Sequence, residues 1–489
     1  MIDVQSFDGT SLLASYRSRM LSPCEVIDAV IAAIERHEDA VNAFCLVDAE
    51  GARRAARASE TRWMRGEPGG DLDGIPITIK DALLWKGHPT RAGSKSSPRD
   101  PAPENAPAVE ELLRAHAIPV GKTTLPEFGW KPVGDSPLYG ITRNPWDLRM
   151  TTGGSSAGAG AAAALNLGVM HLGMDSAGSI RIPSSFCGAF GLKPSHGRVP
   201  FYPPLPFALI ADVGPMTRTV RDAALMITAM ARPDSRDIYA IQTPAPDYRV
   251  GLEDGLRGLR VAWSPRLGFV EKLDPEVEAI TARAARVFEE LGATVTEADP
   301  EWRDPIDTIR LIWRVGSWTE LSSVPEDRWG ESDPGLVAFA RAGRDVSASE
   351  FVAASNARSS LFHTMAQFHD RFDLLLTPAV ATAAFEVGHD TPPDGRFGDD
   401  WFTWAPYSYP FDLTLQPAAS VPCGQTTAGL PVGLQIVGAF LRDDLVLRAA
   451  RAFESVRPWP SLAEPRSSGS RAPADPIGPE RVLQRAEAR

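Results

Sequence analysis

The sequence predicts an α/β fold in which helices pack against a large β-sheet, and two stretches carry this prediction. Residues 259–263, 274–291 and 293–295 predict a strand, a helix and a second strand in succession. Such a unit places its two strands parallel in one sheet. Residues 151–181 predict a loop, a helix, a buried strand and a second loop. The chain of 489 residues has the length of two or three average domains, yet α/β proteins often build several hundred residues around one sheet.

The elements before residue 130 follow from capping signals and hydrophobic spacing. Residues 22–25 (Ser-Pro-Cys-Glu) form a capping box with proline at the first helical position, and apolar residues then recur at helical spacing. A second helix is expected over residues 49–63. Residues 75–80 predict a β-branched strand that ends in a lysine, while residues 107–115 and 118–122 predict a helix followed by a strand.

Two turns rich in glycine and serine, at residues 153–158 and 175–179, flank the middle of the 151–181 stretch. Between them, the alanine-rich residues 159–167 predict a helix and the apolar residues 169–174 predict a short buried strand. A helix plus a strand can bring the two turns side by side. Turns of this composition are common in all proteins, so composition alone assigns no function to them.

The second half of the chain contains three further signals. Residues 301–347 are rich in tryptophan and we expect irregular structure there. A capping box at residues 347–350 begins a helix that extends to about residue 370, and residues 373–377 predict a strand. Residues 392–410 are rich in aromatic residues, glycine and proline, and we expect a loop over the mouth of a site. Residues 460–489 are polar and predict a mostly disordered tail.

Composition restricts the class of protein. The net charge of −12 argues against a nucleic-acid surface, which would be basic. The sequence shows neither an apolar run of about eighteen residues nor a secretory signal pattern. Its four cysteines and eight histidines have no metal-ligand or disulfide spacing. We therefore expect a cytoplasmic protein without metal or cofactor that binds neither nucleic acid nor membrane.

Three short segments match known motifs, but the residues before each segment do not meet the requirements of the motif. Residues 154–158 match the G-x-S-x-G nucleophile elbow around Ser156, but a turn-like segment precedes them where the elbow requires a strand. Residues 158–163 loosely match a dinucleotide fingerprint, again without a strand before them. Residues 121–123 (Gly-Lys-Thr) resemble the end of a phosphate loop, but His116 stands where that loop requires glycine.

Lys80 is a candidate general base. Arginine is effectively never deprotonated, whereas a lysine removed from water can lose its proton. A lysine at the end of a buried strand can therefore accept a proton from a nearby hydroxyl. The alternative is a strand-end lysine that extends its ammonium group to solvent.

Several motifs in order resemble the amidase signature family. The matching segments are residues 74–81, 153–158, 175–183, 186–194, 214–222 and 429–438. The resemblance extends from about Ser22 to Glu454, with its signature core at residues 74–222. It implies one large domain over residues 1–459, with a central mixed, mostly parallel β-sheet covered by helices on both faces.

The resemblance also implies a Ser-cisSer-Lys triad. In this sequence the nucleophile is Ser179, the bridging serine that relays the proton is Ser155, and the base is Lys80. The implied oxyanion hole consists of the backbone N–H groups of Ser176, Ala177, Gly178 and Ser179.

Other site residues follow from the same resemblance. Asp175 and Arg181 are expected to support the nucleophile loop, with an ordinary structural ion pair as the alternative. Gly129, Trp130 and Thr152 are implied as substrate-binding residues, although Trp130 could equally be a packing residue. Two more tryptophans, Trp313 and Trp318, are candidates for the pocket wall or for the core.

This sequence departs from the commonest family pattern at two places. Ala177 replaces a glycine of the nucleophile motif, and its backbone N–H remains available if the local conformation suits alanine. Residues 412–416 (Asp-Leu-Thr-Leu-Gln) replace the usual Asn-x-Thr-Gly in a region expected near the substrate, so that the change bears on substrate identity.

The expected function is hydrolysis of a small linear amide through a serine acyl-enzyme, with esters or carbamates as further substrates. The many aromatic residues favour a hydrophobic or aryl substrate. The expected partner is this small-molecule amide, and a homodimer stays open. Two alternatives also stay open: the A component of an amidotransferase, which releases ammonia from glutamine in a tRNA-dependent complex, and a non-catalytic binding protein of the same fold.

Overall fold

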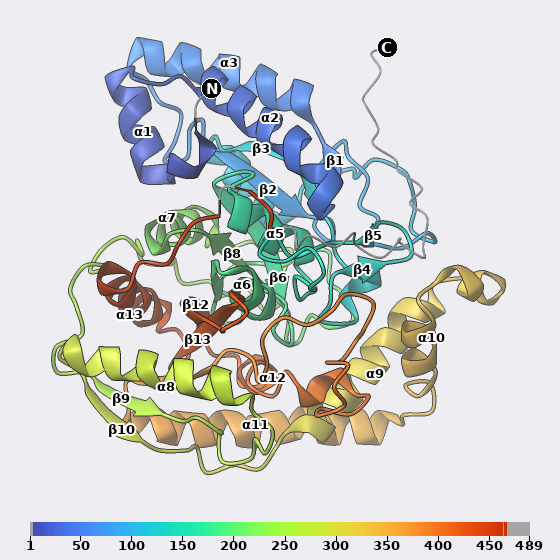
Figure 1. The fold of residues 1–489 in the computed structure, drawn as a ribbon. Helices are drawn as coiled ribbons and strands as arrows, with labels where there is room; N and C mark the ends of the chain where they lie inside the picture. The colour runs from blue at the N-terminus through green and yellow to red at the C-terminus, as the bar shows by residue number, and fades with distance from the viewer. Residues whose placement is uncertain (1–2, 463, 467–489) are drawn as a thin grey trace.

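The computed structural model describes residues 3–462 and 464–466, and within them eleven strands form one sheet (Figure 1). In sheet order the strands are β1 (Phe44–Val47), β3 (Ile118–Thr123), β2 (Pro76–Lys80), β6 (Met170–Asp175), β8 (Asp212–Thr217), β7 (Phe190–Lys193), β12 (Ala418–Gln425), β13 (Pro431–Gly438), β11 (Leu374–Pro378), β9 (Arg260–Trp263) and β10 (Thr294–Glu297). A separate small hairpin consists of β4 (Asp135–Ser136) and β5 (Gly140–Ile141). The α/β class and the single large mixed sheet are confirmed.

The expectation of a mostly parallel sheet is wrong. Among the ten neighbouring strand pairs of the described sheet, four are parallel and six are antiparallel. The parallel pairs form two groups, β3–β2–β6 at one end and β11–β9–β10 at the other, and the latter includes the predicted strand–helix–strand unit. Between these groups the neighbouring strands are antiparallel. The pair β12–β13 is a hairpin closed by residues 426–430, whereas β7 and β8 are joined by the longer segment 194–211.

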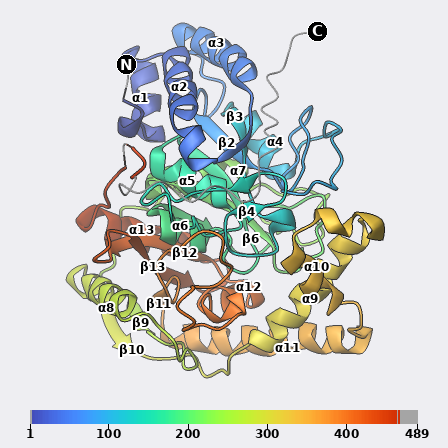
Figure 2. The same ribbon diagram turned by 45° about the vertical axis from the view of Figure 1, so that its right-hand side comes forward.

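Helices lie on both faces of the sheet (Figures 1 and 2). On one face, α5 (Ala157–Leu165) packs against β2, β3, β6 and β8 and contacts α6 (Arg181–Cys187), which covers β12 and β13. On the other, α7 (Val220–Met230) packs on β6, β7 and β8 and contacts α4 (Pro107–Arg114) and α13 (Asp443–Val456). The remaining helices are α1 (Gly9–Ser18), α2 (Pro23–Val41), α3 (Ala49–Arg65), α8 (Pro275–Glu290), α9 (Ile306–Ser322), α10 (Pro334–Arg341), α11 (Ala348–Arg371) and α12 (Tyr409–Leu413), with short 3-10 turns η1 (Val4–Ser6), η2 (Glu127–Gly129), η3 (Glu326–Glu331) and η4 (Trp401–Thr403).

The two predicted capping boxes are confirmed. At α2, the backbone N–H of Glu25 donates to Ser22 Oγ at 3.2 Å and that of Ser22 donates to Glu25 Oε2 at 2.8 Å. The same reciprocal pair joins Ser347 and Glu350 at the start of α11. Each box satisfies two backbone donors that a helix start leaves without partners.

The small residues of α5 allow it to lie almost directly on the sheet. Every residue of this helix is buried. A Cβ atom added at Gly158 would stand 2.1 Å from the carbonyl oxygen of Ala43, so no larger residue fits there. The helix and the strand β6 predicted after it are confirmed with boundaries shifted by one or two residues.

The prediction of irregular structure for residues 301–347 is wrong, because α9, η3 and α10 occupy most of this range. The buried residues Ile309, Ile312, Trp313 and Gly316 of α9 have the spacing of one helical face. The N-cap residue of α9 is Pro305, which has no capping side chain, so the usual sequence signal is missing at that position. Asp304 accepts the backbone N–H of Ile306 at 3.0 Å instead.

Residues 392–410 are mostly irregular, as expected, but only their first part is exposed. Trp401, Phe402 and Trp404 are buried, and η4 and α12 organise the second part. Of the predicted tail, residues 463 and 467–489 lie outside the described residues. Within the described part of the tail, Leu462 is buried and the backbone N–H of Arg466 donates to the carbonyl of Pro145 at 2.8 Å. None of the described helices combines the length and apolar character needed to cross a membrane.

Candidate active site

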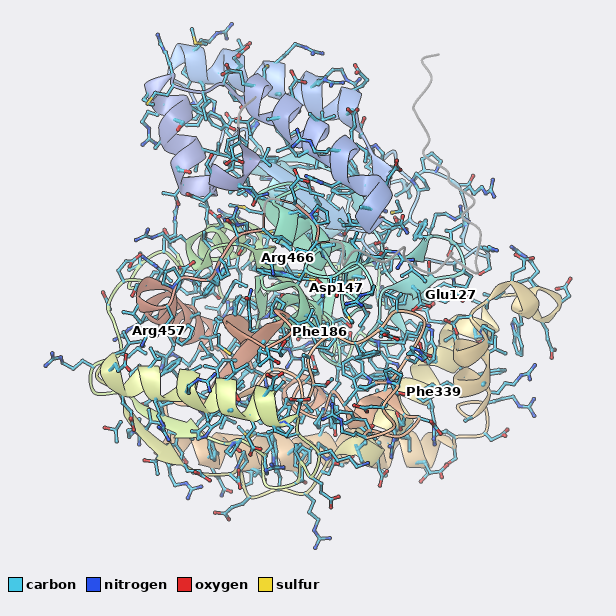
Figure 3. All side chains as sticks on the ribbon, in the orientation of Figure 1. Glu127, Asp147, Phe186, Phe339, Arg457 and Arg466 are labelled. Atoms are coloured by element: carbon cyan, nitrogen blue, oxygen red, sulfur yellow. The ribbon has the colours of Figure 1, made fainter. Side chains whose placement is uncertain are left out.

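The two serine-rich turns lie side by side, as the order of helix and strand predicts. The backbone N–H of Ser156 donates to the carbonyl oxygen of Ser179 at 3.1 Å. The first turn leads into α5 and the second leaves the end of β6 and leads into α6, and these two helices pack on each other. Phe186 of α6, labelled near the centre of Figure 3, marks this part of the molecule.

Lys80 meets the first turn from the neighbouring strand. It is the last residue of β2, which pairs in parallel with β6, so the carboxyl ends of both strands open at the same edge of the sheet. Its Nζ atom lies 2.7 Å from Ser155 Oγ and 3.0 Å from Ser156 Oγ. The ammonium group therefore does not extend to solvent, and the alternative of a solvated strand-end lysine is excluded by the geometry.

Burial lowers the pKa of Lys80 from 10.5 to about 7, against an opposing effect of the Asp175 carboxylate. The cause is that a charged ammonium group loses its hydration inside the protein, while its two hydroxyl neighbours carry no compensating negative charge. A lysine with a pKa near 7 has a large neutral fraction at neutral pH and can accept a proton.

Along the expected path of the proton, from Ser179 through Ser155 to Lys80, the three predicted triad residues become progressively more buried. The exposed fraction is 2% for Lys80, 4% for Ser155 and 8% for Ser179. The peptide bond between Gly154 and Ser155 is cis. On the open side of Ser155 stands Gly129, where an added Cβ atom would lie 3.1 Å from Ser155 Oγ. Because Gly129 has no side chain, the space beside the Ser155 hydroxyl stays open.

Ser156 is a neighbour of Lys80 that the sequence reasoning missed. Its hydroxyl donates to the carbonyl of Met174 at 3.1 Å and accepts from the backbone N–H of that residue at 3.2 Å. Ser156 is fully buried, so a substrate carbonyl does not reach it. Its position indicates that it orients the Lys80 amine, and the adjacent serine pair was the only signal in the sequence.

Asp175 and Arg181 bind each other within the loop that bears Ser179. Arg181 forms a bidentate contact with Asp175, with distances of 2.8 Å from Nη2 to Oδ1 and 3.0 Å from Nε to Oδ2. Asp175 also accepts the backbone N–H groups of Gly178, Ile180 and Arg181. Burial alone would raise the pKa of Asp175, but the guanidinium and these N–H groups hold it well below its usual range.

The predicted oxyanion hole is available in part. Within residues 3–462 and 464–466, no protein acceptor is bound to the backbone N–H groups of Ser176, Ala177 and Ser179. The N–H of Gly178 is the exception and requires a correction, because it donates to Asp175 Oδ1 at 2.6 Å. Ala177 has a negative φ, so alanine fits this position without strain.

Gly178 instead permits close packing behind the loop. Its φ is +113°, and an added Cβ atom would stand 2.5 Å from Ser408 Oγ. The carbonyl oxygen of Ser408 in turn accepts from Arg181 Nη1 at 2.9 Å. Glycine is needed here for both its conformation and its small size.

The unusual 412–416 segment, expected near the substrate, reaches the loop that bears Ser179 through Asp412 and Arg181. The Asp412 carboxylate is fully buried and accepts from Arg181 Nη2 at 2.6 Å, so that it shares one guanidinium with Asp175. Burial raises the pKa of Asp412 well above its usual value, although Arg181 opposes this shift. Asp412, part of the segment that departs from the family pattern, therefore helps Arg181 to hold the loop that bears Ser179.

The predicted pocket residues occupy different environments. Trp130 is buried, and the centroid of its ring lies 6.2 Å from that of Phe339. Its backbone carbonyl accepts a hydrogen bond from Trp313 Nε1 at 2.8 Å. Trp313 stacks on Phe207 at 4.3 Å and forms an aromatic cluster beside the site. Thr152 is fully buried and its hydroxyl donates to the carbonyl of Gly153, so its position does not support substrate contact.

Trp318 lies apart from this aromatic cluster. It is half-buried and its ring meets Trp329 edge to face at 5.9 Å. Among the described residues, no group of three or more His, Cys, Asp or Glu side chains is arranged to hold a metal ion.

Known proteins resemble this chain over most of its length. Residues 25–447 match the family model described as Amidase. An acylamidase from Rhodococcus erythropolis is 38% identical over 462 residues, which cover 92% of this chain and 95% of that protein. The A component of the glutamyl-tRNA(Gln) amidotransferase of Myxococcus xanthus is 36% identical, and the match covers 88% of this chain and 93% of that one. The crystal structure of a bacterial aryl acylamidase of the amidase signature family superposes with a TM-score of 0.86 at 30% identity, covering 93% of this chain and 96% of that one.

Replacement of Arg181 by methionine is expected to destabilise the protein strongly. The variant leaves the carboxyl groups of Asp175 and Asp412 buried without a counter-charge, which typically costs about 3 to 5 kcal/mol. Urea unfolding followed by circular dichroism measures the loss. Arg53→Met, which removes an exposed ion pair with Asp28, is the control and should change the midpoint little. Equal midpoints for the two variants would contradict a supporting role of Arg181.

Proposed function

The chain belongs to the amidase signature family and is an amide hydrolase, and we propose that it cleaves small aryl or otherwise hydrophobic linear amides. The observation that carries the proposed mechanism is the 2.7 Å contact between the buried Lys80 Nζ and Ser155 Oγ, next to the loop that bears Ser179. In this arrangement the Ser179 hydroxyl can serve as nucleophile, the Ser155 hydroxyl as proton relay and the neutral amine of Lys80 as base.

In the first half-reaction, Ser179 Oγ attacks the amide carbonyl carbon. Its proton passes to Ser155, whose own proton passes to neutral Lys80, while the carbonyl electron pair moves onto oxygen. The backbone N–H groups of Ser176, Ala177 and Ser179 are the candidate donors to this oxyanion, and one such donor lowers the barrier by roughly 3 kcal/mol. The carbon–nitrogen bond then breaks as Lys80 returns the proton through Ser155 to the leaving nitrogen.

In the second half-reaction, water attacks the acyl group on Ser179. The water gives a proton to Lys80 through Ser155, and the ester bond to Ser179 breaks as the proton returns to Ser179 Oγ. The products are a carboxylate and an amine. Esters and carbamates present the same carbonyl carbon, so the same steps apply to them.

Two observations support an aryl substrate. The named relatives include an acylamidase and a bacterial aryl acylamidase. Beside the candidate site, the rings of Phe207, Trp313, Trp401 and Phe402 pack together. The ring centroid of Trp313 lies 5.8 Å from that of Trp401 and 6.2 Å from that of Phe402. Aromatic walls stabilise flat apolar groups and exclude water from the reaction.

The purified chain alone is expected to hydrolyse aryl anilides and to release no ammonia from glutamine. Activity of the lone chain is expected because the proposed nucleophile, relay and base all lie within it. Glutamine is expected to be refused because the aromatic cluster beside the site suits a flat apolar group and not a polar side chain. A panel of chromogenic anilides, esters and carbamates, with an ammonia assay on glutamine, measures this. Glutamine-dependent ammonia release only with partner proteins would favour the amidotransferase alternative, which the 36% identical relative represents. No turnover together with no labelling of Ser179 would favour the binding-protein alternative.

Activity is expected to fall at acid pH because protonated Lys80 cannot accept a proton. Below its pKa of about 7, kcat/KM should decrease about tenfold per pH unit. Lys80→Ala should lower kcat/KM by roughly 10²- to 10⁴-fold, and Lys80→Arg should recover none of it because arginine stays charged. Steady-state rates from pH 5 to 9 measure both effects, and an active Lys80→Arg enzyme would rule out this base.

A serine-directed phosphonate is expected to label one peptide, the one that contains Ser179. Ser179→Ala should abolish labelling because the attacking atom is gone. Ser155→Ala should slow labelling greatly without moving it, because only the relay is lost. Mass spectrometry of the digested adduct identifies the labelled residue.

Ser156→Ala provides the control for this experiment. The Ser156 hydroxyl is bound to Met174 and buried, so labelling should persist at Ser179. An adduct on Ser156, or full labelling of Ser179→Ala, would overturn the assignment of roles.

A further inference from the structure

A second buried lysine, Lys131, joins three carboxylates near the candidate site. Its Nζ atom lies 2.9 Å from each of Asp135 Oδ2, Asp333 Oδ2 and Asp390 Oδ1. We call these four residues the Lys131 clamp. Its members come from four places in the chain: the segment after η2, strand β4, the start of α10 and the loop after β11. The clamp thus joins segments that are up to 259 residues apart in sequence.

The clamp is a buried structure and not a surface ion pair. Only 5% of the Lys131 side chain is exposed, and three carboxylates surround one ammonium group. Burial alone would lower the pKa of Lys131, but the carboxylates raise it above its usual value, so the lysine stays charged. Glu127 extends the network, because its Oε2 accepts the backbone N–H of Asp333 at 2.6 Å. Figure 3 labels Glu127 beside the helix α10, which carries Phe339.

The clamp is directly connected to the wall of the candidate site. Lys131 follows Gly129, which lies against Ser155 Oγ, and Trp130, whose ring stands over Gly335. An added Cβ atom at Gly335 would be 2.8 Å from the Trp130 ring. Trp130 is therefore held between the clamp, α10 and the α9 residue Trp313. A shift of the clamp would move Trp130 relative to Ser155.

Asp390 is the outermost member of the clamp and belongs to a mostly exposed segment, residues 386–400, which we call the cover segment. The Asp390 side chain is 40% exposed. Gly388, Gly395 and Gly398 in this segment have positive φ and nothing within 4 Å of an added Cβ, so the segment packs loosely around them. The cover segment leads into the buried aromatic residues Trp401 and Phe402 of the cluster beside the site.

We propose that Lys131 is a positioning residue that sets the size of substrate accepted, by holding the cover segment and the start of α10 against Trp130. Loss of the Asp390 ion pair loosens the cover segment, which keeps the hydrogen bond from Trp404 Nε1 to the Asp390 carbonyl, while the contacts of Lys80 and Ser155 stay unchanged. This inference rests on the proposed hydrolysis of amides at Ser179. It adds a physical reason for substrate selection that lies outside the reacting groups.

Asp390→Asn is the variant that tests the clamp. It keeps the shape of the side chain and removes one charge at the exposed edge, whereas Lys131→Met would leave several carboxylates buried and could prevent folding. Asp399→Asn is the matched control, because Asp399 is an exposed carboxylate of the same segment that is not part of the clamp. Asp390→Glu retains the charge and should restore the parent behaviour.

The first readout is selectivity. For Asp390→Asn, the ratio of kcat/KM for a bulky anilide to that for acetanilide should rise at least threefold. The change should appear mainly as a higher KM for acetanilide with nearly unchanged kcat, since the reacting groups are not moved. A ratio equal to that of Asp399→Asn would overturn the proposal.

The second readout does not depend on activity. Arg396 is an exposed trypsin site within the cover segment, and cleavage after it should be at least threefold faster in Asp390→Asn than in the parent or Asp399→Asn. Equal cleavage rates would overturn the proposal even if the chain hydrolyses anilides. Conversely, a parent chain without any amide hydrolysis would reject the proposed function, while the trypsin experiment would still decide whether the clamp holds the cover segment.

Discussion

The chemistry proposed for this protein depends on the removal of Lys80 from water. Within the described part of the chain, its amine contacts the hydroxyls of Ser155 and Ser156 and no carboxylate. In water the same group would hold its proton at neutral pH, and the two serines beside it would have no base. The position of Lys80 at the end of the interior strand β2, covered by the alanine-rich helix α5, produces this desolvation.

The negative charge nearest to this base is neutralised by the contacts around it. Asp175 opposes the shift of the Lys80 pKa, and its carboxylate is bound by Arg181 and by three backbone N–H groups. The same contacts shape the loop that carries Ser179, and they leave the N–H groups of Ala177 and Ser179 without an acceptor among the described residues. Arg181 thereby links the electrostatics of the base to the geometry of the oxyanion site.

The helices α9 and α10 and residues 386–410 together form what we call the covering part of the molecule. They bring aromatic rings and the Lys131 clamp next to Trp130. Relatives at similar identity include an acylamidase and a component of an amidotransferase, so membership of the family does not by itself fix the substrate.

Local sequence patterns were sufficient for the elements whose signals are local. The capping boxes at Ser22 and Ser347 and the strand–helix–strand unit around α8 depend on neighbouring residues, and the structure confirms them. The ordered motifs also identified the family and brought Lys80, Ser155 and Ser179 forward as candidates, although the sequence could not show that they meet. The helix α9 was missed because proline occupies its N-cap position, where the usual capping residues are absent.

Only the tertiary structure decided which of these groups share one environment. The proximity of Lys80 to Ser156 and the sharing of Arg181 between Asp175 and Asp412 arise from segments up to 231 residues apart. The balance of parallel and antiparallel strands was likewise set by which strands became neighbours. Sequence determines the chemical groups and their local conformation, whereas burial, charge neutralisation and pKa depend on the groups that folding brings from elsewhere in the chain.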